Sequence, residues 1–269
     1  MEQMEKSKMA TELEEIKLQV AQANRVLSDV GLATGVTSAL GHASMRVPSQ
    51  PDRFVVKGRQ YALDALAIMR AEDMVVCDTE GFLVDASPGI TQCSEVKIHS
   101  CIYKTRPDVQ SIVHVHPRFI VLMSVLGVPL APMCQEGIHL VRHPLPIYPH
   151  VKTIQNDAEG MEVAHLLADG SALLLQGHGA VTTGTSLAES VTAMLQLEEQ
   201  ARMNYYAYCA MGRDYPRIPE ELIDEMTNRP PLHTLPHFHN VLQGRAPQRD
   251  GIWNYRVSRV SQDLFGRTQ

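Results

Sequence analysis

Apolar residues recur at helical spacing near the start of the chain, and this pattern predicts an opening amphipathic helix. They lie three or four positions apart from Thr11 to Asp29, and Gly31 follows as a stop. A stretch rich in Gly, Ser and Thr comes next, and short apolar runs bounded by Asp, Gly or Pro follow it. We interpret these runs as strands of one sheet. They are Arg53 to Val56, Met74 to Val76 and Phe82 to Val84.

Helical and strand patterns alternate through the middle of the chain. A helix is predicted from about Ser94 to Lys104, and the strand SIVHVHP begins at Ser111. An apolar helix from Phe119 to Leu126 then ends at Gly127. Further on, SALLLQ is a compact buried strand that breaks at Gly177-His178-Gly179, and the longest helical pattern runs from Leu187 to Cys209.

The last part of the chain is rich in proline and has little periodicity. From Pro216 to Pro247 it contains Pro230-Pro231 and Pro236. Such a segment is expected to wrap the surface of its own domain or of a neighbouring subunit. The chain therefore divides into one large domain, residues 1–215, and a C-terminal extension, residues 216–269.

Composition favours a globular protein that acts on a small molecule. The length of 269 residues suits one large α/β domain with a variable tail. The net charge is −6, from 24 basic and 30 acidic residues, without a Lys/Arg-rich run, which argues against nucleic acid or an anionic membrane as a partner. No apolar window reaches membrane-spanning length and the charged N-terminal stretch lacks a signal-peptide core, so we expect a soluble cytoplasmic protein. Five scattered cysteines without a CxxC pair predict reduced thiols.

The strand SIVHVHP carries the first sign of chemistry. Because side chains alternate along a strand, His114 and His116 share one face with Ile112, while Val113 and Val115 share the other. Two imidazoles so placed can converge on one ion. An isolated HxH is more often a pair of solvent-facing polar positions, but here other metal-binding residue types accompany it.

Two residues elsewhere complete the predicted metal site. His178 lies between two glycines after a buried strand, where the backbone can turn sharply and present the ring to a cleft. Glu95 lies 19 residues before His114 and either completes the metal shell or acts as an acid/base. Its alternative role is a first-turn acid of a helix capped by Ser94. Histidine with one carboxylate suits Zn²⁺, Mn²⁺ or Fe²⁺, one ion per subunit.

Further residues are candidates for binding a substrate. In GHASMR, His42, Ser44 and Arg46 form a Gly/Ser loop in which His42 and Arg46 suit a carboxylate, the alternative for Arg46 being a surface ion pair. Other segments have a more ordinary explanation. Lys57-Gly58-Arg59 form a solvated hairpin turn or contact an anion, and Gln135 and Glu136 lie in a loop that either returns to the site or stays apart from it. The histidines His233, His237 and His239 lie in a surface loop or a lid over the active site, and Tyr205, Tyr206 and Tyr208 serve in aromatic packing, with a proton donor as the alternative.

The run SEVKIHSCIYKTRPDVQSIVHVHP, followed by LLLQGHGAVTTGTSLAESVTAMLQLEE, resembles the class II aldolase/adducin superfamily over about residues 10 to 210. The resemblance rests on the carboxylate, the HxH strand and the GHG turn recurring in that order. It implies a three-layer α/β/α fold with a central, mainly antiparallel sheet, and a homotetramer with active sites at subunit interfaces. It also implies metal ligation by His114, His116 and His178, with Glu95 as a ligand or an acid/base.

Departures from the sugar-phosphate members of this family indicate a different substrate. Those members hold phosphate with a Gly-Asn-x-Ser loop and paired serines, whereas this chain has Gly41-His42-Ala43-Ser44 and Thr91-Gln92-Cys93-Ser94. The tyrosine that family aldolases use as a proton donor has no evident counterpart in APMCQEGIHL. The Gly-His-x-Ser start and the long C-terminal extension look more like the family's decarboxylases of hydroxylated aromatic or pyridine carboxylic acids.

The favoured prediction is therefore a metal-dependent carbon–carbon lyase that decarboxylates a hydroxylated aromatic or heteroaromatic acid, with Glu95 supplying a proton to the ring carbon. The same metal shell also serves aldol cleavage, so an aldolase or epimerase acting on a sugar or sugar phosphate stays open. An iron-dependent oxygenase on the same scaffold is a third possibility. An adducin-like scaffold would have no need to keep the three histidines and Glu95 together.

Overall fold

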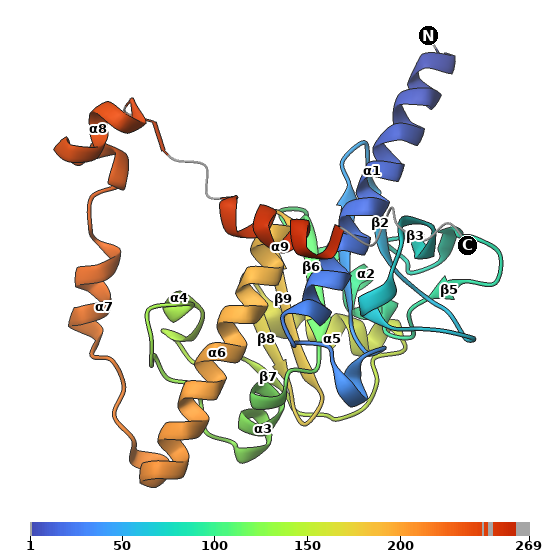
Figure 1. Cartoon of the computed structure of the whole chain (residues 1–269). Coiled ribbons are helices and arrows are strands. Elements are labelled where there is room, and N and C mark those ends of the chain that lie inside the picture. The colour runs from blue at the N-terminus through green and yellow to red at the C-terminus, as the bar shows by residue number, and fades with distance from the viewer. Residues whose placement is uncertain (1, 244, 247–249, 262–269) are drawn as a thin grey trace.

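A central sheet with helices on both faces forms the body of the protein (Figure 1). The computed structural model describes residues 2–243, 245–246 and 250–261. The strands are β1 (His42–Val47), β2 (Gln50–Arg59), β3 (Met74–Asp78), β4 (Leu83–Asp85), β5 (Thr91–Gln92), β6 (Ser111–Val115), β7 (Ile147–Tyr148), β8 (Ala172–Leu175) and β9 (Gly179–Gly184). The helices are α1 (Glu2–Asp29), α2 (Val96–Thr105), α3 (Arg118–Leu126), α4 (Ile138–Val141), α5 (Asp157–Leu167), α6 (Leu187–Met211), α7 (Glu220–Thr227), α8 (Pro236–Leu242) and α9 (Gly251–Ser261).

Within these residues the strands follow the order β4-β3-β2-β1-β6-β9-β8-β7, and β5 pairs with β2 beside this path. All neighbours are antiparallel except β7 and β8. At the centre, β1 pairs with β6 so that His42 lies opposite His114. The predicted α/β/α fold with a mainly antiparallel sheet is confirmed.

The two faces of the sheet bury two separate apolar cores. One core lies under α1, α3 and α6, and the other lies under α2 and α5. Side chains of β6 divide between them as alternation requires, because Val113 and Val115 join the first core and Ile112 joins the second. His114 therefore shares the α2 face with Ile112, as the sequence pattern predicts.

Most predicted elements are present, but several observed elements were not predicted. The predicted helices match α1, α2, α3 and α6, and the predicted strands lie in β2, β3, β4, β6 and β8. The GHASMR segment, interpreted as a loop, is the central strand β1. Its polar positions are buried against α2, so the expected contrast between an apolar and a polar face is absent. Helix α5 and strand β9 were also missed.

The C-terminal extension, in which the sequence shows little periodicity, contains the helices α7, α8 and α9. Helix α7 is joined to the body by ion pairs from Arg142 to Glu220 and Asp224. Helix α9 returns to pack along α1, where Arg259 pairs with Asp29 at 2.9 Å (Figure 1). Between them α8 stands away from the sheet. Pro247 and the end of the extension lie outside the described residues.

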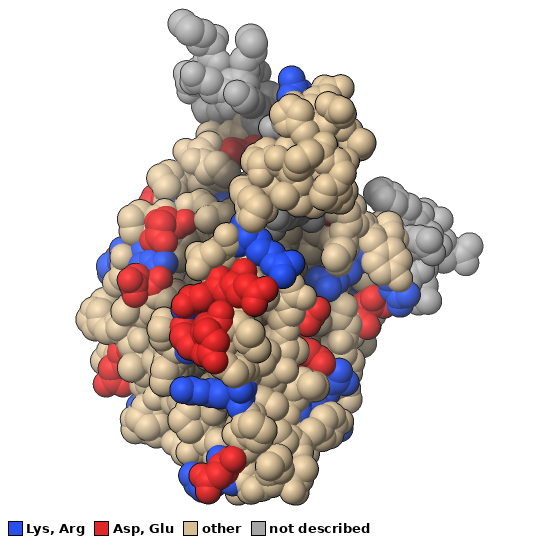
Figure 2. Space-filling view, turned by 90° about the vertical axis from the view of Figure 1, so that its left-hand side faces the viewer, with Lys and Arg blue, Asp and Glu red and all other residues tan. Residues whose placement is uncertain are grey.

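Charge is unevenly distributed over the side of the molecule that carries the extension (Figure 2). Helix α7 contributes four acidic residues, Glu220, Glu221, Asp224 and Glu225, whereas α8 has no Lys, Arg, Asp or Glu. All five cysteines are free, and three of them are buried. None of the helices in the described part of the chain combines the length and the apolar character needed to cross a bilayer.

A carboxylate on α6 holds the start of α3, immediately after the HxH strand. Glu198 accepts hydrogen bonds from the backbone N–H groups of Phe119 and Ile120, both at 3.0 Å. These N–H groups belong to the first turn of α3 and have no partner inside the helix. Burial raises the pKa of Glu198 to about 7, although the two backbone hydrogen bonds oppose the rise.

We predict that Glu198→Gln reduces the dependence of stability on pH. The folded pKa lies above the ordinary value of 4.5, so Glu198 takes up a proton on folding, and the free energy of unfolding falls as pH rises from about 4.5 to about 7. In the Gln variant the free energy of unfolding should fall less over this pH range, because the uptake of up to one proton on folding is removed. Urea unfolding between pH 4.5 and 7.5 measures it, with Glu199→Gln as the control. Parallel pH profiles for the wild type and Glu198→Gln would refute the prediction.

Candidate metal centre

His114 is oriented for ligation by a hydrogen bond on the far side of its ring. It is fully buried near the end of β6, and its Nδ1 lies 3.0 Å from the carbonyl oxygen of Ala180 on β9. A carbonyl only accepts, so Nδ1 carries the proton and Nε2 presents its lone pair. This arrangement is typical of histidine ligands, in which a second interaction fixes the tautomer.

Glu95 occupies the N-cap position of α2, but its side chain does not cap the helix. Its Oε2 instead lies 3.2 Å from Nε2 of His114 and 3.4 Å from Nε2 of His178. Its Oε1 accepts the backbone N–H of Ile154 at 3.0 Å. The alternative of a helix-stabilising acid after a Ser94 cap therefore does not describe this residue.

The glycine turn after β8 brings His178 to the same point. Gly177 has φ +65°, and a Cβ on Gly179 would lie 2.3 Å from the carbonyl oxygen of Val115. Only glycine permits both the turn and this close approach to the end of β6. The rings of His116 and His178 lie edge to face with centroids 4.6 Å apart.

The four side chains fit a divalent cation. One ligand atom from each of Glu95, His114, His116 and His178 lies within 4.8 Å of the others. Ligands about 2.05 Å from one ion lie about 3.3 Å apart in a tetrahedron and about 2.9 Å apart along an octahedral edge. Nε2 of His114 lies 3.1 Å from Nε2 of His116 and 3.2 Å from Oε2 of Glu95, and Nε2 of His178 lies 3.4 Å from the same oxygen. These separations match the two spacings. Nδ1 of His178 is buried without a hydrogen-bond partner among the described residues.

Electrostatics keep Glu95 and His116 in the protonation states that a metal needs. Burial opposes the charge of Glu95, but His114 and His178 outweigh it and hold the pKa of this carboxyl well below its usual range. Burial, followed by the neighbouring His114 and His178, lowers the pKa of His116 to about 3. A carboxylate beside the neutral imidazole of His116 suits a divalent cation.

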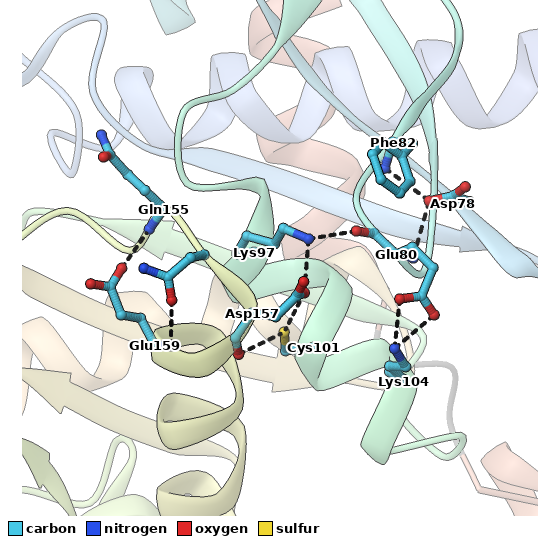
Figure 3. A network of polar contacts seen from close by, with 10 residues as sticks. Asp78, Glu80, Phe82, Lys97, Cys101, Lys104, Gln155, Asp157 and Glu159 are labelled. Carbon is cyan, nitrogen blue, oxygen red and sulfur yellow. Dashed lines mark hydrogen bonds and ion pairs between the residues drawn. The ribbon is translucent and has the colours of Figure 1, made fainter.

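Contacts on the outer side of α2 hold the helix that carries Glu95 (Figure 3). Lys97 donates to the carbonyl of Glu80 at 2.6 Å and to Asp157, the first residue of α5, at 2.8 Å. At the same end of α5, Asn156 accepts the N–H of Glu159, and Glu159 accepts the N–H of Gln155. This capped turn follows Ile154, whose N–H binds Glu95. Exposed ion pairs such as these stabilise little singly, so we assign them mainly an orienting role.

Of the three predicted substrate-binding residues, His42 lies beside the centre, and Ser44 lies behind it, connected to His42 through His99. The ring centroid of His42 is 5.3 Å from that of His114, and Nδ1 of His42 lies 2.6 Å from Nε2 of His99. Ser44 is fully buried, and its hydroxyl lies 2.6 Å from Nδ1 of His99.

Arg46 does not fit its predicted role as a carboxylate ligand. Its guanidinium is buried and donates to the backbone carbonyls of Val109, Pro51, Tyr103 and Arg106. It also lies over the ring of Tyr103 at 4.6 Å. Four of its five N–H donors are thus used within the protein, and Arg46 is a structural residue of the β1–α2 interface rather than a surface ion pair.

Lys57-Gly58-Arg59 is not a solvated turn. These residues end strand β2, and the side chain of Lys57 is buried in an ion pair with Asp64 at 2.7 Å. Arg59 contacts the same carboxylate at 3.3 Å. Gly58 pairs with Gln92 on β5, three residues before Glu95. The positive charge of Lys57 is therefore already compensated inside the protein.

The remaining candidates lie away from the centre. Gln135 lines a hollow against α7 with Ile138 and Leu222, and Glu136 is exposed. Tyr205 and Tyr206 stack around Phe119, which is the packing role expected for them, and Tyr208 packs against the core. The tail histidines lie at η5 (Leu232–Thr234) and on α8, not in a surface loop, and no second metal cluster occurs among the described residues. These histidines are His233, His237 and His239.

The structure adds two residues that sequence reasoning missed. A pocket of about 540 Å³ is lined by His116 and His178 together with Arg118, the first residue of α3. His99, on α2, joins His42 to Ser44. A signal for His99 exists in the sequence, because Glu95, His99 and Tyr103 are spaced four apart and share one helix face.

A family comparison agrees with this geometry. The family model described as "Class II Aldolase and Adducin N-terminal domain" matches residues 18–205. The chain belongs to the class II aldolase/adducin family. Class II aldolases are metal-dependent, so the family accounts for the His/Glu cluster as a metal site of an enzyme.

Class II aldolase relatives of this chain have different activities in their names. A 3,4-dihydroxyphthalate decarboxylase from Rhodococcus jostii is 29% identical over 209 residues, which cover 75% of this chain and 84% of the relative. A probable L-ribulose-5-phosphate 4-epimerase UlaF from Mycoplasma pneumoniae is 27% identical over 216 residues, covering 72% and 82%. The structure of L-fuculose 1-phosphate aldolase from Glaciozyma antarctica, 22% identical, superposes with a TM-score of 0.69 over 94% of this chain and 91% of that one.

We predict that His114→Ala loses the bound metal. The variant removes a buried ligand and leaves the Glu95 carboxylate without one of its two imidazole neighbours. Elemental analysis of purified protein should give about one ion per chain for the wild type and much less for the variant. The reason is that the metal affinity of the variant is lower by a factor of about ten to a hundred or more. His139→Ala, an exposed histidine on α4, is the matched control. Unchanged metal content in a folded His114→Ala protein would contradict the site.

Proposed function

We propose that the protein is a metal-dependent carboxy-lyase that removes CO₂ from a hydroxylated aromatic or heteroaromatic carboxylic acid. The main support is the pocket beside His116 and His178. Its wall is largely apolar, with Leu32, Val36, Val121 and Leu122, and Arg118 is its one charged residue among those described. Apolar walls with a single guanidinium suit a flat, anionic ring.

The relatives support the same substrate class. The Rhodococcus jostii relative, which the chain matches over most of its length, is a decarboxylase of a dihydroxylated aromatic acid by name. The buried ion pair of Lys57 with Asp64 also supports the proposal. Because Asp64 compensates its charge, Lys57 at the end of β2 is not free to bind a phosphate. In this proposal Arg118 takes the carboxylate role that the sequence suggested for Arg46.

Each residue of the centre has a distinct part in the proposed reaction. An ion held by His114, His116 and His178 would supply Lewis acidity for the negative charge that develops on the substrate. Glu95 is a carboxylate in the resting protein and can take the proton of a substrate hydroxyl. As the bond to the carboxyl group breaks, its electrons stay on the ring carbon. Glu95 then returns the proton to that carbon, and CO₂ leaves.

We predict that Glu95→Gln removes activity without removing the fold. An amide of the same shape neither accepts nor returns the proton, so kcat should fall by a factor of about a hundred to ten thousand. Protein loaded with Zn²⁺, Mn²⁺ or Fe²⁺ is incubated with a panel of hydroxylated benzoic and pyridine carboxylic acids, and released CO₂ is measured.

Arg118→Met should raise KM for the acid that loses CO₂ about tenfold, because a charged hydrogen bond to the carboxylate is lost.

A second reaction class has its own support, since the epimerase and aldolase relatives share the fold over most of the chain. Sugar phosphates are therefore included in the panel. Cleavage or epimerisation of a sugar phosphate, with no CO₂ from any acid, would replace the proposed function. Oxygen consumption in the Fe²⁺-loaded protein would instead indicate an oxygenase.

Three predictions about organisation also stay proposals. We propose that residues 1–215 form the catalytic domain with residues 216–269 as an extension, that the protein is a homotetramer, and that it is cytoplasmic. The contacts of α7 and α9 with the body support the proposed extension. The free cysteines support the cytoplasmic location. Light scattering of the purified protein measures the assembly.

A further inference from the structure

A buried chain of hydrogen bonds leads from His42 away from the metal centre. Nδ1 of His42 meets Nε2 of His99 at 2.6 Å, and Nδ1 of His99 meets the Ser44 hydroxyl at 2.6 Å. The Ser44 hydroxyl lies 2.8 Å from the Tyr103 hydroxyl, which donates to the carbonyl oxygen of Gln110 at 3.5 Å. His99 and Ser44 are fully buried, and Tyr103 is 2% exposed. Every contact in this chain is thus made within the protein.

The carbonyl at the end gives the chain a direction. A carbonyl oxygen only accepts, so a Tyr103 hydroxyl that donates to it, at 3.5 Å, accepts from Ser44. Ser44 then accepts from Nδ1–H of His99, which leaves Nε2 of His99 without a proton. Nε2 of His99 in turn accepts from Nδ1–H of His42. All donors point towards Gln110.

The opposite direction makes one buried hydrogen bond fewer. Tyr103 would then donate to Ser44, and its oxygen would face the Gln110 carbonyl oxygen without a proton between them. That carbonyl is held in place by the backbone N–H of Arg46, which donates to it at 2.9 Å. Its second lone pair remains for Tyr103. The direction towards Gln110 makes this additional hydrogen bond inside the protein and is preferred on that ground.

The rings of His42 and His99 are buried, and their hydrogen bonds in this chain are to an imidazole nitrogen and a hydroxyl group rather than to a carboxylate, so burial favours neutral rings with a single proton each. Burial also lowers the pKa of His99 to about 3, with His114 as the next cause. Burial raises the pKa of Tyr103, which therefore keeps its proton.

We propose that His99, Ser44 and Tyr103 are positioning residues that hold His42 with its proton on Nδ1, so that Nε2 accepts a hydrogen bond from a hydroxyl group of the substrate. The ring of His42 is 4% exposed and its centroid lies 5.3 Å from that of His114, so the proposal places the substrate hydroxyl between the metal centre and this ring. A carboxylate has no proton to donate, so His42 selects for hydroxylation of the substrate and not for its acid group. The substrate class rests on the proposed function, whereas the direction of the chain does not.

The tautomer of His42 is measurable without turnover. Protein labelled with ¹⁵N-histidine and loaded with Zn²⁺ gives long-range ¹H–¹⁵N correlation spectra in which protonated and bare ring nitrogens differ, and His42→Gln assigns the signals. We expect a bare Nε2 on His42 in the wild type and a mixture of tautomers in Tyr103→Phe, which loses only the hydroxyl. Tyr148→Phe is the matched control, since the hydroxyl of this buried tyrosine donates to Glu162. A protonated Nε2 in the wild type, or the same tautomer in Tyr103→Phe, overturns the proposal.

Two further measurements separate this proposal from the proposed function. Addition of 3,4-dihydroxybenzoate should shift the Nε2 signal of His42, and addition of benzoate should not. Equal shifts with both acids overturn the hydroxyl assignment. For an acid that loses CO₂, Tyr103→Phe should lower kcat/KM about tenfold, and His99→Gln, whose amide can accept from His42 and donate to Ser44, should retain more activity than His99→Leu. Since the tautomer is read without substrate, failure of the CO₂ assay alone leaves it standing.

Discussion

The buried carboxylate of Glu95 is the constraint to which the rest of the centre conforms. Removing a carboxylate from water is costly unless cations or hydrogen-bond donors replace the solvent. Glu95 is 6% exposed; the N–H of Ile154 donates to one of its oxygens, and the other faces Nε2 of His114 and of His178, where a cation shared by the three side chains would satisfy it. These groups come from three separate segments of the chain, which must meet at one point for the charge to be tolerated. A metal ion strengthens the same convergence, because it is attracted by the charge that the fold has buried.

The same constraint extends outward from the site. Glu95 begins α2, so the position of its carboxylate depends on how this helix lies on the sheet. Below the helix, polar groups of β1 contact His99 and Tyr103, and outside it Lys97 ties the helix to α5. The interface between α2 and the sheet is therefore unusually polar for the interior of a domain. Such an interface specifies one arrangement, since each group has few partners that can satisfy it.

The sequence was most informative where function depends on a short-range pattern. The alternation of His114 and His116 and the glycines around His178 each define local geometry, so three candidate ligands could be predicted from their neighbours alone. The strand β1 was missed because His42, Ser44 and Arg46 are polar and yet buried, which removes the contrast that marks a strand face. Residue types alone do not show that Arg46 donates to distant backbone carbonyls or that the N–H of Ile154 donates to Glu95. The helices of the extension follow proline-rich stretches whose short apolar patterns are weak.

Pairing of β1 with β6 links strand register to chemistry. With His42 opposite His114, the imidazoles of both strands lie on the α2 face. A slip of β1 by one residue would turn His42, Ser44 and Arg46 to the face occupied by α1 and bring Ala43 and Met45 under α2. The apolar core on the α1 face would then receive an arginine and the polar interface would receive methyl groups. A shifted register is thus unfavourable on both faces of the sheet. The polar residues of β1 therefore help to specify the strand pairing as well as forming part of the site.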